Sequence, residues 1–168
     1  MVRIIDPKFR GNAGQYLFQC TLAFMTVLGL LFFLDLLLHT VIIASLGSTA
    51  FIVFTMPNSR TARTRALLGG HLVGVGVGCA CSLLSRAPLI LSLFHEYETR
   101  LTVFGALAVA AAIFLMVCTN TEHPPAAGMA LGLVSDRWDT RTVAFIFIAV
   151  TLLALARRLL RRVMIDLV

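Results

Sequence analysis

Four apolar stretches, each long enough to cross a lipid bilayer, constrain this chain more than any other feature. These stretches are Tyr16–Leu38, Ala66–Leu84, Leu101–Thr119 and Thr142–Ala156, the last of which is extended by Leu159 and Leu160. A membrane-spanning helix needs about 20 predominantly apolar residues. With 59% hydrophobic and 13% charged residues among 168, the chain also has too few polar side chains to cover a soluble domain. We therefore predict an all-α integral membrane protein, a compact bundle with four full transmembrane helices.

The basic residues indicate membrane topology rather than nucleic-acid binding. The formal net charge is +6, and most Lys and Arg residues lie in three short clusters beside apolar stretches, at positions 3–10, 60–65 and 157–162. Such clusters mark the cytoplasmic side of a membrane and contact anionic lipid headgroups. We expect membrane lipids as partners, no nucleic acid, and both termini in the cytoplasm of a bacterial cell whose inner membrane holds the protein.

Two shorter apolar stretches are irregular. Thr40–Met56 is interrupted at 46–49, where the sequence reads Leu-Gly-Ser-Thr, and Pro57 stops it. Pro124–Val134 has only 11 residues, about 16 Å of helix or half a bilayer. If both stretches cross, all three basic clusters lie on one side, whereas four spans with two re-entrant loops would put the cluster at 60–65 outside. Charge favours six crossings, two of them by interrupted or half-helix segments.

Six crossings divide the single domain, residues 1–168, into two halves at about 12–86 and 99–162. Each half reads as a long helix, an interrupted segment and a long helix. Because three is odd, the halves have opposite orientations, as in transporters built from inverted repeats. Two inverted three-segment repeats and two independently kinked helices both fit this pattern.

The tripeptide His123-Pro124-Pro125 predicts the start of a helix. A residue before proline is pushed to extended backbone angles, and proline suits the first turn of a helix. We expect a helix from Pro124, capped from 121–123. The first-turn N–H groups of Ala126 and Ala127 would then be free, at the positive end of the helix dipole.

A second helix start is predicted inside Thr40–Met56. Ser48 or Thr49 can cap a half-helix there, with Gly47 allowing the backbone to turn. The two helix N-termini would then meet near mid-membrane from opposite sides and form a site for a small anion. The alternative is that Gly47 and the prolines only permit close packing.

Three ionisable residues lie at or near these segments. Glu122 and His123 are candidates for proton coupling, since an ionisable side chain at membrane depth is costly and presumed functional. The alternative places them in a loop at the cytoplasmic interface. His71 lies at the edge of a smooth face made by Gly70, Gly74 and Gly78. His71 could equally line the transport pathway or form a hydrogen bond that packs two helices together.

No enzyme motif occurs in the chain. Gly-x-Ser-x-Gly, His-Glu-x-x-His and the Walker A glycine loop are all missing, although each would accompany a common catalytic mechanism. Four cysteines lie inside apolar stretches, and Cys79-Ala80-Cys81 is not a zinc or redox spacing. We expect no catalytic residues, no metal and no cofactor.

Three sequence blocks resemble the HPP family of integral membrane proteins, which is named after the tripeptide at 123–125. The blocks are Gly47-Ser48-Thr49-Ala50 running to Phe54 and Pro57, Gly69-Gly70-His71-Leu72 with Gly74 and Gly78, and Thr121–Gly128 followed by Ala130-Leu131. The resemblance covers nearly the whole chain. Members are usually described as having four membrane spans. Plastid and cyanobacterial members are associated with nitrite transport, which the resemblance implies here.

We therefore expect a secondary carrier or channel for a small inorganic anion, in the first place nitrite, bound near mid-membrane at helix N-termini. A non-transporting membrane scaffold or sensor subunit is the alternative. Homo-oligomer formation is left open. The residues expected to bind the anion are Gly47, Ser48, Thr49, His71, Thr121, His123, Pro124, Pro125, Ala126 and Ala127.

Overall fold

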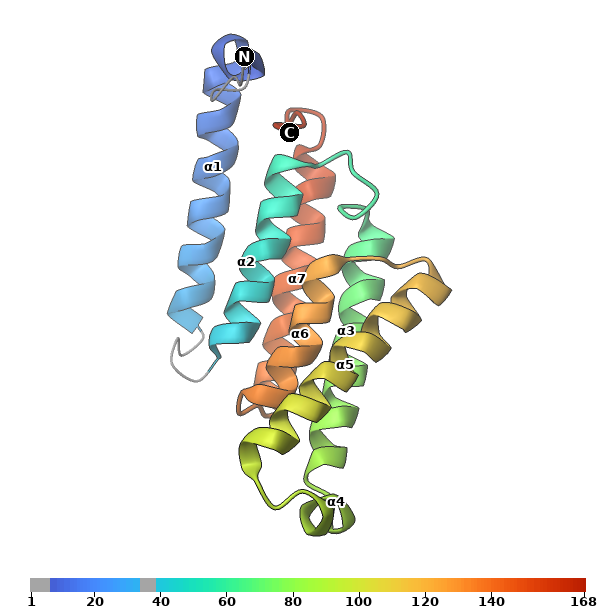
Figure 1. The fold of residues 1–168 in the computed structure, drawn as a ribbon. Helices are drawn as coiled ribbons and strands as arrows, with labels where there is room; N and C mark the ends of the chain where they lie inside the picture. Colours follow the sequence, from blue (N-terminus) through green and yellow to red (C-terminus); the bar gives the residue numbers. More distant parts are fainter. Residues whose placement is uncertain (1–6, 34–38) are drawn as a thin grey trace, which may run out of the picture.

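The computed structural model describes residues 7–33 and 39–168, which form helices joined by short connections (Figure 1). The helices are α1 (Pro7–Phe33), α2 (Thr40–Thr55), α3 (Thr64–Ser85), α4 (Pro88–Leu93), α5 (Tyr97–Thr119), α6 (Pro124–Ser135) and α7 (Thr140–Leu160). No strand occurs within these ranges. Four helices, α1, α3, α5 and α7, are long and apolar enough to cross a membrane. The predicted all-α membrane fold with four spanning helices is confirmed; the expected end of the first span, at 34–38, lies outside the described residues.

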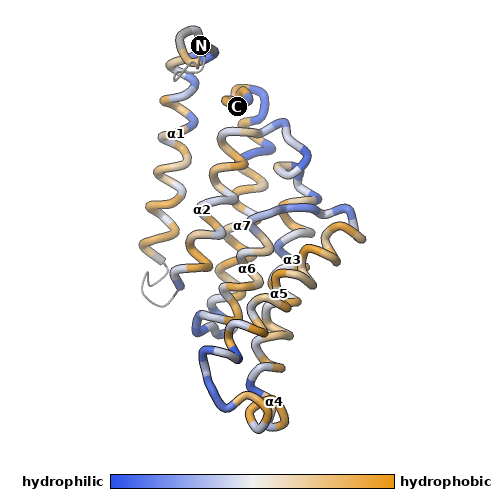
Figure 2. The backbone as a smooth tube through the Cα atoms, in the orientation of Figure 1, coloured by the Kyte–Doolittle hydropathy of each residue, from blue (hydrophilic) through white to orange (hydrophobic). Residues whose placement is uncertain are grey.

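The six longer helices alternate in direction along the bundle. The beginning of α1, the α2–α3 connection and the C-terminus lie at one end, and α4 and the α6–α7 connection lie at the other (Figure 1). We call the end with the beginning of α1 and the C-terminus the terminal end. It carries Lys8 and the basic residues at 60–65 and 157–162. Figure 2 shows hydrophilic residues mainly at the two ends and in the connections, with hydrophobic helices between them. Helix α2, in the irregular Thr40–Met56 stretch, therefore runs along the bundle toward the terminal end instead of looping back.

The predicted interruption of the Thr40–Met56 stretch is wrong. α2 is one continuous helix from Thr40 to Thr55, and no described glycine has a positive φ. Ser48 Oγ donates to the Ala44 carbonyl at 2.9 Å, and Thr49 Oγ1 donates to the Ser45 carbonyl at 3.0 Å. Hydroxyl groups that bond back to the preceding turn are tolerated within a helix. A membrane also favours an unbroken helix, because every backbone polar group must be satisfied internally.

The predicted start of α6 is confirmed. α6 begins at Pro124, and His123 before it is extended, with φ −137° and ψ 96°. Two details differ from the expectation. No side chain caps the helix, and the Ala126 N–H donates to the His123 carbonyl at 2.9 Å instead of being free. With 12 residues, α6 is about 18 Å long.

Glycines on α3 allow α6 and the connection before it to lie against this helix. A Cβ added at Gly78 would come within 2.9 Å of the Ala130 backbone, and one at Gly70 within 2.7 Å of the His123 Cβ. Gly74 faces the Ala126 carbonyl in the same way. The smooth glycine face predicted from the sequence is therefore a helix contact, as small residues are in membrane proteins. α6 is packed between α2, α3 and α5, and eight of its residues are buried.

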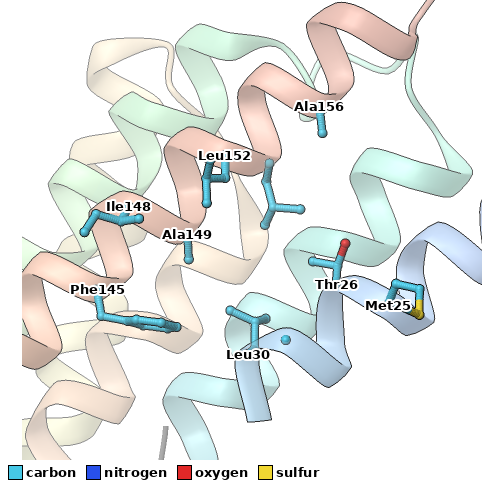
Figure 3. Close-up of a pocket in the computed structure, with 10 residues that line it drawn as sticks. Met25, Thr26, Leu30, Phe145, Ile148, Ala149, Leu152 and Ala156 are labelled. Atoms are coloured by element: carbon cyan, nitrogen blue, oxygen red, sulfur yellow. The ribbon is translucent and has the colours of Figure 1, made fainter. Parts of the chain in front are cut away.

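α1 stands at the edge of the bundle and packs mainly on α2 (Figure 1). Near the terminal end, buried Gln19 donates to the carbonyls of Phe54 and Ile165 and accepts from the Ile165 N–H. Farther along, an apolar groove of about 610 Å³ opens between α1 and α7 (Figure 3). Its lining includes Leu30 of α1 and Phe145 of α7.

The connection before α7 forms a capping box. The Asp139 carboxylate accepts from the Thr142 N–H at 2.8 Å, and the Asp139 N–H donates to the Thr142 hydroxyl. These hydrogen bonds, first of all that from the Thr142 backbone, lower the pKa of Asp139. Helix α4, which the sequence analysis did not anticipate, begins at Pro88. The order long, short, long recurs in both halves, but their relation as inverted repeats stays a prediction.

Candidate functional site

Three polar side chains from different parts of the chain meet inside the apolar bundle. His71 comes from α3, Thr49 from α2 and His123 from the α5–α6 connection, and all three are fully buried. Thr49 Oγ1 lies 3.1 Å from His123 Nε2 and 3.4 Å from His71 Nε2. The two imidazole rings have centroids 5.0 Å apart and planes tilted by 43°. We call these three residues the histidine cluster.

The other nitrogen of each ring is held by a backbone carbonyl. His71 Nδ1 lies 2.9 Å from the Leu67 oxygen, one turn earlier in α3. His123 Nδ1 lies 2.9 Å from the Thr61 oxygen in the α2–α3 connection. A carbonyl oxygen only accepts, so we assign the proton of each neutral ring to Nδ1. Both Nε2 atoms are then acceptors that face the Thr49 hydroxyl.

Ser45 ties α2 to α6 beside the histidine cluster. It lies one turn before Thr49 on the same face of α2, and its hydroxyl donates to the Pro125 carbonyl at 2.6 Å. The Ser45 carbonyl in turn accepts from Thr49. This contact positions Thr49 relative to the start of α6.

The α2–α3 connection covers the histidine cluster at the terminal end. Thr61 contacts His123 through its carbonyl, and Ala62 beside it is fully buried. Two exposed arginines join this end to the α5–α6 connection: Arg60 donates to Asn120 Oδ1 at 3.3 Å, and Arg65 donates to the Thr119 carbonyl at 2.8 Å. The cluster is thus closed from solvent, and exposed arginines lie on the side of the connection that covers it.

The structure brings some of the predicted site residues together and separates others. Thr49, His71 and His123 form the cluster, with Pro125 beside it through Ser45. The buried residues Thr121, Ala126 and Ala127 pack around its α5–α6 side, Thr121 against Gly69 and Ala126 against Gly74. Ser48, Glu122 and Pro124 are exposed, and Gly47 is half-buried.

The proposed convergence of two helix N-termini is wrong. α2 does not begin at Ser48 or Thr49, so no second helix N-terminus faces the start of α6 from this stretch. Glu122 lies in a groove of about 270 Å³ on the outer face of α5 and α6, with apolar neighbours such as Ile113 and Pro124. Glu122 is therefore separate from the histidine cluster. Of the two proton-coupling candidates, only His123 belongs to the cluster.

The sequence analysis missed two participants. Ser45 could have been found, because it lies four residues before Thr49 and therefore on the same face of a continuous helix. The Thr61 carbonyl could not have been found, since every residue has a backbone carbonyl and the residue type does not indicate which one contacts a side chain. The residues lining the apolar groove between α1 and α7 do not include any member of the histidine cluster (Figure 3).

Comparison with known proteins agrees with this architecture. The family model described as "HPP, transmembrane region" matches residues 8–164. The chain belongs to the HPP family. A transmembrane protein of Dictyostelium discoideum is 34% identical to this HPP-family chain over 113 residues, which are 66% of the chain and 36% of that protein. The match thus spans about a third of the length of this relative. No solved structure matches the chain.

In this HPP-family protein the tripeptide has a structural explanation. Pro124 and Pro125 start α6, and His123 is held extended before them. The extended backbone lets the His123 ring reach both α2 and the α2–α3 connection. The motif therefore places a titratable ring at the junction of three segments.

Proposed function

We propose that this HPP-family protein transports a small inorganic anion of the nitrite class across the membrane, by a secondary carrier or channel mechanism with the histidine cluster as the binding site. The observation that carries the proposal is the convergence of two buried imidazoles on one hydroxyl within an apolar bundle. Buried ionisable groups in membrane proteins are costly and generally mark substrate or proton pathways.

The charge around the cluster supports an anion as substrate. Arg60, Arg63 and Arg65 are exposed at the terminal end, where positive potential raises the local concentration of anions. We propose that the positive clusters face the cytoplasm, with both termini there, and that the protein lies in a bacterial inner membrane. We also propose that the chain is not itself an enzyme, because the Thr49 hydroxyl beside the two rings is fully buried and donates to the Ser45 carbonyl.

Uptake into liposomes that contain only this protein tests the proposal. Nitrite, nitrate, formate and chloride are compared as substrates, with protein-free vesicles as the background for permeation of neutral nitrous or formic acid. Thr49→Val removes the shared hydroxyl with little change in shape, and we expect uptake to fall about tenfold or more, as for loss of a buried polar partner. Folded protein that moves none of the four anions would favour the scaffold or sensor alternative.

Thr55→Val is the matched control for Thr49→Val. Thr55 lies on the same helix, and its hydroxyl donates to the Phe51 carbonyl at 2.8 Å in the same intrahelical pattern. It does not contact the histidine cluster. We expect Thr55→Val to retain the uptake of the unmodified protein, and equal losses in both variants would remove Thr49 from the site.

A further inference from the structure

The hydrogen bonds of the histidine cluster are unbalanced. The Thr49 hydroxyl has one hydrogen, but three acceptors lie around it: the Ser45 carbonyl at 3.0 Å, His123 Nε2 at 3.1 Å and His71 Nε2 at 3.4 Å. With both rings neutral and protonated at Nδ1, one hydrogen cannot satisfy three acceptors. A buried acceptor without a donor is unfavourable.

One added proton removes most of this imbalance. A proton on the Nε2 lone pair of either ring makes that nitrogen a donor to Thr49 Oγ1, which has lone pairs to accept it. The Thr49 hydrogen then serves the Ser45 carbonyl or the second ring. Two protons are disfavoured, because imidazolium rings with centroids 5.0 Å apart would repel each other. The cluster is therefore suited to one proton at a time.

A proton in this position lacks a negative partner among the described residues. α2 and α6 carry no ionisable side chain. The ionisable side chains on the surrounding segments are Arg60, Arg63, Arg65, Cys79, Cys81, Glu122, Arg157 and Arg158, with Tyr97, Glu98, Arg100, Cys118 and Arg141 elsewhere on α5 and α7. Arg157 donates to the Pro57 carbonyl, and Glu122 lies in the outer groove. Within residues 7–33 and 39–168, no carboxylate faces either ring.

We propose that the histidine cluster binds one proton and one anion together, so that transport is electroneutral symport. This inference rests on the proposed transport function. The anion supplies the negative charge that a buried imidazolium needs, and on binding it replaces Thr49 Oγ1 as the acceptor of the added Nε2 hydrogen. Each ligand therefore raises the affinity for the other, by thermodynamic linkage. Release reverses both steps, and the proton leaves Nε2 with the anion.

The proton-to-anion ratio in proteoliposomes tests the coupling without any variant. Nitrite and nitrate are the probes, external pH is followed during uptake, and potassium with valinomycin sets the membrane potential. Protein-free vesicles again give the background for neutral nitrous acid. We expect the medium to lose one proton for each anion taken up through the protein. The initial rate of anion uptake should increase with the pH gradient and should not depend on the membrane potential.

Two variants localise the coupling. His71→Gln and His123→Gln each leave a fixed amide in place of a titratable ring. Because either ring can take the proton, we expect proton movement to weaken in each single variant and to stop in the double variant. Uptake that carries current and moves no protons, in the unmodified protein, would overturn the coupling and leave the transport function standing. Full proton coupling in the double variant would also overturn it. Absence of any uptake by folded protein would overturn the proposed function itself.

Discussion

His71 and His123 approach to a ring-centroid distance of 5.0 Å because the residue before His71 has no side chain. A Cβ at Gly70 would lie 2.7 Å from the His123 Cβ and 2.9 Å from the Thr121 carbonyl oxygen. The α3 backbone and the α5–α6 connection can therefore touch at this point. The glycine face of α3 and the geometry of the histidine cluster are thus one structural feature.

Gly70→Ala should damage both packing and transport. The added methyl group must displace either the His123 side chain or the connection that carries it, and overpacking of this kind costs about 1–3 kcal/mol. We expect a lower melting temperature in detergent and a marked loss of anion uptake. Gly76→Ala on the same helix is the matched control, because nothing lies within 4 Å of a Cβ there. Equal behaviour of the two variants would contradict the close contact.

Gly47→Ala and Ser48→Ala should have little effect, because both positions lie within a continuous helix. A Cβ at Gly47 meets nothing within 4 Å, and alanine is favoured over glycine in a helix by up to about 1 kcal/mol. Thermal unfolding and liposome uptake measure the two properties. Loss of transport in both variants, with folding intact, would support the interrupted helix that the structure contradicts.

Arg60→Gln should change uptake in a salt-dependent way. Arg60 is exposed at the terminal end and donates a hydrogen bond to Asn120. Its charge therefore acts on the anion through solvent. We expect a rise in KM of about two- to threefold at low ionic strength, which vanishes near 0.5 M salt as screening shortens the range of the charge to about 4 Å. A loss of transport that persists at high salt would place the binding site in the α2–α3 connection.

Cysteine labelling should place the two ends of the bundle on opposite sides of the membrane. Arg63→Cys lies in the α2–α3 connection and Glu96→Cys just before α5, both exposed. In a background whose native cysteines are replaced, an impermeant maleimide should label position 63 from the cytoplasm and position 96 from outside, since positive clusters stay inside. Labelling of both positions from one side would contradict the six-crossing arrangement.

Membrane embedding and the main helix boundaries were predictable from local sequence. Length and hydropathy were sufficient for α3, α5 and α7, because a bilayer demands apolar helices of about 20 residues. The start of α6 followed from His123-Pro124, since proline restricts the backbone on both sides of the bond. The spacing of Gly70, Gly74 and Gly78 likewise predicted a face for close packing.

The continuity of α2 and the composition of the site depended on tertiary structure. Leu-Gly-Ser-Thr at 46–49 resembles a helix break by local propensity alone, but hydroxyl bonds within the helix and packing against α6 and α7 stabilise the unbroken form. Residue type showed that Thr49, His71 and His123 were candidates. Which nitrogen of each ring faces Thr49 was decided by the carbonyls of Leu67 and Thr61, because backbone groups are the same in every sequence and only the fold brings them to a given side chain.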